Sequence, residues 1–321
     1  MGLPSIYERS DAELIPKPVL REFQKMGKLV EGRKDMVGLI IDNLRQSMQN
    51  GHVMTLFLDG LPGSGKSGME EKVRKIVVNE GVLPEDQVVT FPLDLFIGTE
   101  QGSNERARMT QTPDLFGRHY MRYTEARERL QEVFARMKKP EEGSIQIPRA
   151  YLRDEPHNGK FGNFTLNVSP DTKLVIVEGT GSIDNLAGPD GFPAWVDPYL
   201  VFMHMTKKQS LFRATLRDIR RGKGGASFED IYQKRDREYQ YLTSRLLPSV
   251  RLADKVCVRF PKKDDFRRRL AVTEQEIEAK NAANPDPDQT QKTTRQILSA
   301  VDPAFLRNIF PGELPQDYRF V

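Results

Sequence analysis

The 321-residue sequence contains one cysteine, Cys257, and only four histidines. A disulfide within the chain needs two cysteines, so a reducing compartment, the cytoplasm, is the expected location. A structural zinc site usually needs clustered cysteines or histidines, and this composition disfavours one. No apolar run is long enough to cross a bilayer, and the first residues lack the pattern of a signal sequence. We therefore expect no membrane partner.

The chain also has little excess charge. Its formal net charge is +4 and its pI is about 9.0. A surplus of this size is compatible with an anionic ligand such as ATP and does not require nucleic acid. The length exceeds what one hydrophobic core usually needs, which favours one large domain with extensions, or two domains.

A glycine-rich segment, GLPGSGKSG at 60–68, directly follows the apolar run VMTLFLD at 53–59. The spacing of its glycines, lysine and serine fits the phosphate-binding loop G-x-x-x-x-G-K-[ST]. Glycines let backbone N–H groups close around an anion, and the N-terminus of the following helix adds positive charge. A simple Gly-rich turn is the alternative, but the strand before it and the helical pattern after it favour a nucleotide site. The residues expected to bind the nucleotide are Gly60, Gly63, Ser64, Gly65, Lys66 and Ser67.

Strand-like and helical patterns alternate along the middle of the chain. The runs at 173–179 and 199–205 are continuously apolar, as expected for strands buried on both faces of a parallel sheet. A further strand is predicted at 88–96, and helices are predicted within 19–49 and at 115–137. With a phosphate loop after the first strand, the pattern predicts an α/β fold, a three-layer P-loop sandwich with a mostly parallel sheet.

Two acidic residues stand where predicted strands end, Asp94 in FPLDLF and Glu178 in LVIVEG. Ligands of parallel α/β sheets gather beyond the carboxyl ends of the strands, so both acids would face the phosphate loop. Asp94 is a candidate general base or Mg²⁺ ligand, although Asp is also common in turns. Glu178 follows four apolar residues, where a carboxylate is costly without a partner, and Mg²⁺ with ATP would supply one.

The segment SLFRATLRDIRRGKGG at 210–225 places four arginines on one helical face. An ordinary solvated face is one interpretation. Like charges at this spacing repel one another, however, and a lid over transferring phosphates would give them a function. The four are Arg213, Arg217, Arg220 and Arg221.

Together, these motifs resemble the uridine kinase and phosphoribulokinase branch of the P-loop kinases. The family's D-x-F, P-D-x-F and E-G motifs correspond to residues 94–96, 113–116 and 178–179. Its lid signature R-x-x-L-R-D-x-x-R-G corresponds to 213–222. Its substrate-side strand and histidine correspond to IPRAY, with Tyr151, and to His157. The resemblance covers roughly 53–260 and implies a kinase domain there, with a lid at about 207–226. Outside it, the residue pattern predicts a helical N-terminal extension at 1–52 and a C-terminal extension at 261–321 with a linker near 283–291.

The resemblance also implies the role of each residue. The enzyme would use ATP and Mg²⁺ to phosphorylate a hydroxyl of a nucleoside-like or sugar-like acceptor. Lys66, Asp94, Glu178 and Arg217 would be catalytic, with Asp94 taking the hydroxyl proton. Ser67, Asp94 and Glu178 would hold Mg²⁺, and Lys66, Arg213, Arg217 and Arg221 would bind phosphates. Gln111, Asp114, Tyr151 and His157 would contact the acceptor.

Departures from the family pattern concentrate on the acceptor side. Gln111 replaces the acid that grips the ribose diol, Ile97 replaces a tyrosine, and the arginine after His157 is missing. An alternative acceptor is therefore a hydroxyl in nucleic acid, such as a hydroxymethylated base in DNA, which the basic stretch KKDDFRRR at 262–269 also suggests. A non-catalytic ATP-sensing module is a third interpretation. The sequence leaves a homo-oligomer open.

Overall fold

A computed structural model describes residues 15, 17–100, 103–111, 120–139, 143–153, 157, 159–187, 191–220, 227–258, 275, 300–302, 304 and 305. The chain divides into two units. The first comprises 1–205 and 240–259, and the second 206–239 and 260–321. The predicted linker at 283–291 and nearly all of the predicted C-terminal extension lie outside the described residues.

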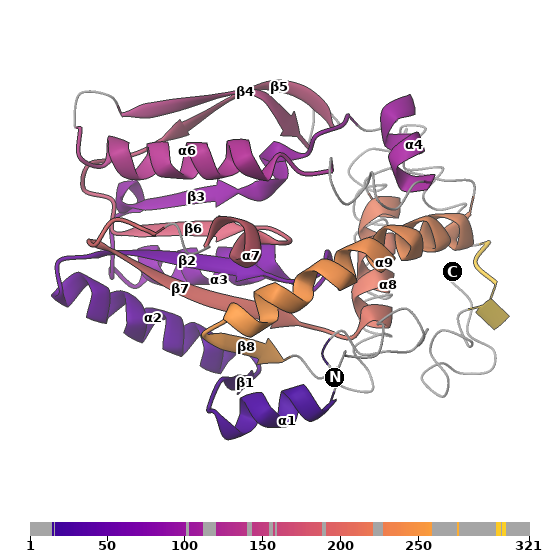
Figure 1. Cartoon of the computed structure of the whole chain (residues 1–321), viewed down its shortest axis with the longest axis horizontal. Helices are drawn as coiled ribbons and strands as arrows, with labels where there is room; N and C mark the ends of the chain where they lie inside the picture. Colours follow the sequence, from indigo (N-terminus) through magenta and orange to yellow (C-terminus); the bar gives the residue numbers. More distant parts are fainter. Residues whose placement is uncertain are drawn as a thin grey trace. The chain divides into compact units, whose positions relative to one another are not determined.

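The first unit is built on a six-stranded sheet in which every neighbouring pair is parallel (Figure 1). The strand order is β1-β8-β7-β2-β6-β3, so the strand that precedes the phosphate loop, β2, lies between β6 and β7. The predicted α/β fold with a mostly parallel sheet is confirmed. The strands are β1 (Leu29–Glu31), β2 (Val53–Asp59), β3 (Val88–Pro92), β6 (Leu174–Glu178), β7 (Val196–His204) and β8 (Lys255–Val258).

Helices and one antiparallel hairpin complete this unit. The hairpin consists of β4 (Ser144–Leu152) and β5 (Lys160–Asn167), and α6 (Tyr123–Arg136) packs against β4. The other described helices of the unit are α1 (Lys17–Lys25), α2 (Arg33–Gln49), α3 (Lys66–Asn79), α4 (Asn104–Gln111), α7 (Ser182–Leu186) and the second half of α9 (Phe228–Leu252), with short 3₁₀ helices η2 (Glu85–Gln87) and η3 (Leu93–Phe96).

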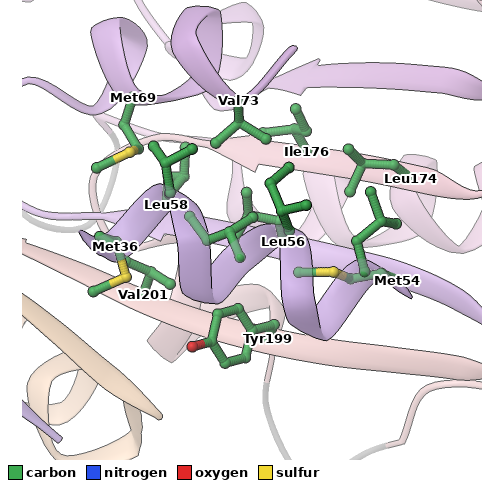
Figure 2. Close-up of a cluster of buried hydrophobic side chains, with 14 of the residues drawn as sticks. Met36, Met54, Leu56, Leu58, Met69, Val73, Leu174, Ile176, Tyr199 and Val201 are labelled. Atoms are coloured by element: carbon green, nitrogen blue, oxygen red, sulfur yellow. The ribbon is translucent and has the colours of Figure 1, made fainter. Parts of the chain in front are cut away.

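The core explains why β2 reads as an uninterrupted apolar run. All seven of its residues are buried, because helices cover the sheet on both faces. On one face, Met54, Leu56 and Leu58 pack with residues of α2 and α3, including Met36 and Met69 (Figure 2). On the other face, the ring of Phe57 packs against Phe192, whose ring also meets Phe134. Burial of this kind is the main favourable term in folding.

The second unit contains α8 (Lys207–Arg220) and the first half of α9 (Phe228–Leu252), up to Tyr239. Asp218 of α8 forms an ion pair with Arg235 of α9, and Arg235 also pairs with the buried Glu238. Phe212 of α8 packs its ring 5.8 Å from that of Phe228 at the start of α9. The two helices are therefore joined by both apolar and ionic contacts.

Three predicted elements differ in extent from the observed ones. The strand predicted at 88–96 ends at Pro92, and the chain continues as η3, because proline has no N–H for a further sheet hydrogen bond. In the described part of the helix predicted at 115–137, α6 begins at Tyr123. The helical stretch expected within 19–49 is interrupted by β1, which lies between Gly27 and Gly32, both with positive φ.

Candidate active site

The phosphate loop lies between β2 and α3 and requires glycine for steric reasons. Gly60 has a φ of 140°, and a Cβ there would lie 2.5 Å from the carbonyl oxygen of Met203. Gly65 caps α3 with a φ of 98°, and the Arg33 guanidinium donates a 3.0 Å hydrogen bond to its carbonyl. A Cβ on Gly65 would collide with that guanidinium. The loop therefore presents bare backbone at the N-terminus of a helix, the arrangement that binds phosphates.

Lys66 is the first residue of α3 and is buried inside this loop. Its Nζ donates to the carbonyl oxygens of Gly60 at 2.9 Å and Leu61 at 3.1 Å, and to Oγ1 of Thr180 at 3.3 Å. The Thr180 hydroxyl in turn donates to Gly60. The ammonium is thus held by oxygens of the loop itself, where a nucleotide's phosphates would bind.

Asp59, the last residue of β2, holds the start of the phosphate loop through hydrogen bonds. Its carboxylate accepts backbone N–H hydrogen bonds from Gly60 at 2.6 Å, Gly181 at 2.7 Å and Ile183 at 3.1 Å. Burial raises the pKa of Asp59, and hydrogen bonds from Ser249 and from these amides oppose the rise. Sequence reasoning missed this residue, although an acid ending an otherwise apolar strand was the available signal.

Two of the predicted Mg²⁺ ligands are in direct contact. The Ser67 hydroxyl donates a 3.3 Å hydrogen bond to the carboxylate of Glu178, the last residue of β6. Burial raises the pKa of Glu178 above its ordinary value, and the nearby Asp94 charge raises it further, whereas Lys66 and Arg153 act in the opposite direction. The strand register explains why Ser67, Glu178 and Asp94 lie close together. Glu178 is the register partner of Leu58 in β2 on one side and of Pro92 in β3 on the other.

These groups suit Mg²⁺. The ion prefers oxygen ligands and usually keeps several waters and nucleotide phosphates around a small number of protein groups. A hydroxyl and two carboxylates from Ser67, Glu178 and Asp94 are such a set. Among the described residues, no cluster of three or more His, Cys, Asp and Glu side chains could hold a metal by itself. A metal at this position would therefore depend on the serine and on the nucleotide.

Asp94 lies on η3 and forms an ion pair with Arg153, the residue that follows β4. Burial lowers the pKa of the Arg153 guanidinium, but the opposing charges of Asp94 and Glu178 and the phenols of Tyr120 and Tyr151 outweigh it and raise the pKa overall. Arg153 is the functional candidate that sequence reasoning overlooked. It stands two residues after Tyr151, whereas the family pattern directed attention to a missing arginine after His157.

The predicted acceptor residues are described unequally. Tyr151 is buried on β4, and its hydroxyl lies 3.5 Å from Nη1 of Arg106. His157 is exposed in the turn between β4 and β5. Gln111 is the last residue of α4, but its side chain, like all of Asp114, lies outside the described structure. Tyr151 thus lies near Arg153, and the acceptor-binding roles of all four residues stay predictions.

The predicted lid arginines belong to the second unit. Arg213 and Arg217 lie on α8, and Nε of Arg217 is 3.8 Å from a carboxylate oxygen of Asp218. Arg221 lies outside the described residues. Their action over the phosphate loop stays a prediction. None of the helices in the described part of the chain combines the length and apolar character needed to cross a bilayer.

Comparison with known proteins finds likeness in structure only. No family model matches the chain, and no curated protein matches it. A possible uridine kinase from Bacillus stearothermophilus is 14% identical, with a TM-score of 0.40, and the match covers 68% of this chain and 99% of that one. D-glycerate 3-kinase from Cryptococcus neoformans var. grubii is 15% identical, with a TM-score of 0.38, over 82% of this chain and 84% of that one. The chain is thus similar, at low identity, to kinases of different acceptors.

Proposed function

We propose that the protein is a kinase that uses ATP and Mg²⁺ to phosphorylate a hydroxyl of a nucleoside-like or sugar-like acceptor. The observation that carries the proposal is the meeting of three strand ends. The loop after β2 holds Lys66 and Ser67, β6 ends in Glu178 within hydrogen-bond distance of Ser67, and η3 after β3 brings Asp94 near Glu178. A cation, a hydroxyl and two carboxylates at a phosphate loop are the parts that phosphoryl transfer needs.

In this proposal the loop N–H groups and Lys66 bind the β- and γ-phosphates. Ser67, Glu178 and Asp94 hold Mg²⁺, which when bound neutralises charge on the phosphate oxygens. Asp94 accepts the proton of the acceptor hydroxyl while the oxygen of that hydroxyl forms a bond to the γ-phosphorus. At the same time the bond between the γ-phosphorus and the β–γ bridging oxygen breaks, and ADP leaves. Arg213, Arg217 and Arg221 would stabilise the charge that spreads over the transferred group.

The second candidate is a kinase acting on a hydroxyl in nucleic acid. The observation that favours it is the clustering of arginine and aromatic side chains beside Asp94, where Arg106 lies over the rings of Tyr120 and Tyr151. Aromatic side chains interleaved with cations are a common way to hold a single strand. An ATP sensor without catalysis is the weakest candidate, because Asp94 and Glu178 would then have no use beyond binding.

The proposal is tested by incubating the full chain with γ-labelled ATP and Mg²⁺ and measuring label transfer. The acceptors would be uridine, deoxyuridine, ribose, glycerate and a single-stranded oligonucleotide containing 5-hydroxymethyluracil. Transfer to one class that is lost in Lys66→Ala is the expected result. Binding of ATP without transfer to any hydroxyl in this panel, and without hydrolysis, would favour the sensor instead.

The ratio of ribo to deoxy acceptors tests the role of Gln111. An amide lacks the paired acceptors with which a carboxylate binds a vicinal diol. We expect kcat/KM to be about equal for matched ribo and deoxy compounds. A preference for ribose of about a hundredfold or more would show that another residue, such as Asp114, binds the diol, because a site built to hydrogen-bond a hydroxyl can reject the analogue without it by about 10⁴- to 10⁵-fold.

A further inference from the structure

Three arginines lie on the acceptor side of the site, where an uncharged acceptor would need none. Arg106 comes from α4, Arg149 from β4, and Arg153 from the residue after β4. Arg106 lies 5.5 Å from the ring centre of Tyr120 and 5.7 Å from that of Tyr151. The same two phenols raise the pKa of the Arg153 guanidinium. Arg106 and Arg153 therefore both lie close to Tyr120 and Tyr151.

Arg149 reaches the same hairpin surface through a bulge. The register of β4 with β5 shifts between Ile147 and Ala150, and Arg149 has a φ of 52°, the only positive φ among the described non-glycine residues. Its carbonyl accepts a 2.7 Å hydrogen bond from Arg122, which supports this conformation. Strained backbone of this kind is maintained mainly at functional sites.

The bulge leaves the Arg149 side chain exposed, with its guanidinium 5.0 Å from the ring centre of Phe161. Phe161 is the register partner of Tyr151, so both rings stand on one side of the hairpin. A guanidinium stacked on a ring keeps its N–H edge available to a ligand in the plane of the group. The three arginines and the three rings therefore form one surface beside Asp94, which we call the arginine–aromatic surface: Arg106, Arg149, Arg153, Tyr120, Tyr151 and Phe161.

Two glutamates described near this surface have other partners, and Glu100 also interacts electrostatically with Arg149. Glu125 pairs with Arg122 at 2.5 Å, and Glu100 accepts a 2.9 Å hydrogen bond from the Phe161 amide and lies 3.5 Å from Lys160. Asp94 pairs with Arg153, so this arginine joins the surface to the candidate active site.

We propose that the acceptor carries a phosphate ester besides the hydroxyl that is phosphorylated, and that the arginine–aromatic surface binds that ester. The proposal rests on the proposed kinase function. Guanidinium forks match phosphate oxygens in two-point hydrogen bonds, and aromatic rings can stack on an attached base or sugar. Binding of that phosphate positions the acceptor beside Asp94, so an acceptor without the phosphate binds weakly and reacts slowly.

The same phosphate chemistry occurs in a nucleoside monophosphate, a sugar phosphate and the backbone of a nucleic-acid strand. The test measures binding of a fluorescein-labelled 12-nucleotide oligothymidylate by anisotropy, with thymidine 5′-monophosphate, ribose 5-phosphate and thymidine as competitors. Saturating Mg²⁺ and ADP are included so that the phosphate loop is filled. The variants are Arg149→Gln and Arg153→Gln, with Arg45→Gln on the exposed face of α2 as matched control. Thermal unfolding of each variant reports whether it folds.

We expect a phosphate-bearing ligand to bind, binding to weaken as NaCl rises from 50 to 200 mM, and each of the two variants to lose about tenfold in affinity. Arg45→Gln should bind like the parent. Competition by thymidine monophosphate or ribose 5-phosphate as well as by the oligonucleotide would identify a small phosphorylated acceptor, and binding of the oligonucleotide alone would identify a strand.

Three results would overturn the inference. The first is competition by thymidine as strong as that by its monophosphate, and the second is a folded Arg149→Gln that binds like the parent. The third is loss of phosphate binding in Lys66→Ala, which would show that the phosphate ester binds in the phosphate loop. A different result would contradict the proposed kinase function. Label transfer with no preference for phosphorylated acceptors contradicts only this inference, whereas phosphate binding with no transfer from ATP contradicts the proposed function.

Discussion

The hydroxyl of Ser67 donates a 3.3 Å hydrogen bond to the carboxylate of Glu178, which joins the phosphate loop to the end of the neighbouring strand β6. Their contact requires the loop, β2 and β6 to keep their register, because Glu178 is aligned with Leu58 only two residues before the loop begins. The site is thus a property of the sheet rather than of the loop alone.

Lys66→Ala should nearly abolish phosphoryl transfer while the fold survives. The ammonium is hydrogen-bonded to loop oxygens and to Thr180, so its loss removes charge stabilisation from the phosphates, an effect of about 10²-fold or more in kcat. The matched control is Lys72→Ala, an exposed lysine on the same helix. Turnover is measured with circular dichroism as the folding check. Equal turnover in Lys66→Ala and the parent would contradict a catalytic loop.

Asp94→Asn keeps the shape of the side chain but removes its negative charge and most of its basicity. We expect kcat to fall by about 10²- to 10⁴-fold, the usual contribution of general base catalysis, with little change in the Kd for ATP. Steady-state kinetics and calorimetry with ATP separate the two quantities. A variant that is less stable but turns over normally would make Asp94 a structural turn residue that pairs with Arg153.

Glu178 should impose a pH dependence on Mg²⁺ use. Burial, as the largest cause, raises its pKa above 4.5, and only the ionised carboxylate can hold the metal. The Mg²⁺ affinity of the ATP complex should therefore rise as the pH increases from about 4.5 through the raised pKa. Glu178→Gln should show a flatter profile and need more Mg²⁺ above the raised pKa, whereas variant and parent should converge below it. Titrations of Mg²⁺ against ATP-complex formation check this, and identical profiles for variant and parent would exclude Glu178 as a ligand.

Asp59 should affect stability more than chemistry. Its pKa is raised above 3.8 in the folded protein, mainly by burial, so the folded state binds more protons than the unfolded chain between 3.8 and the raised value. Stability should therefore fall as the pH rises through that window, and Asp59→Asn should lose this slope.

At neutral pH the asparagine variant should be less stable by about 1–3 kcal/mol, because its NH₂ group would face a backbone N–H donor. Urea unfolding at several pH values measures both effects. Asp42→Asn, an exposed position on α2, is the control. A variant as stable as the parent, with the pH slope intact, would show that Asp59 does not anchor the loop.

The sequence predicted the parts of the fold that depend on local patterns. The loop is specified by glycines needed for close backbone approach, as at Gly60, and the buried strands by continuous apolar runs. Strand β1 was not predicted, because the three residues of LVE carry no local signal and become a strand only by pairing with β8. The bounds of β3 were extended too far for a related reason, since Asp94 and its neighbours continue the apolar pattern in a different backbone conformation.

The candidate site was predicted unevenly for physical reasons. Lys66, Ser67 and Glu178 could be placed because parallel strands bring their carboxyl ends to one edge of the sheet. Arg153 could not, because it reaches Asp94 only through the hairpin of β4 and β5, whose packing has no short-range signature. The same holds for the strained Arg149. The family pattern identified Tyr151 as a candidate. It expects the next arginine after the histidine, so Arg153, which precedes His157, was not predicted.

The pairing of β1 with β8 has a consequence for synthesis of the chain. Leu29 and Val256 are register partners, so the first of the described strands to be synthesised cannot pair until the last of them has been made. Until β8 has emerged, β7 presents an unpaired edge of apolar residues, and such edges recruit strands from other chains. A chain truncated before Lys255 would keep the phosphate loop and all three strand ends of the site but would be prone to aggregate. Strand β8 thus joins β1 to the rest of the sheet, although it contributes no residue to the candidate site.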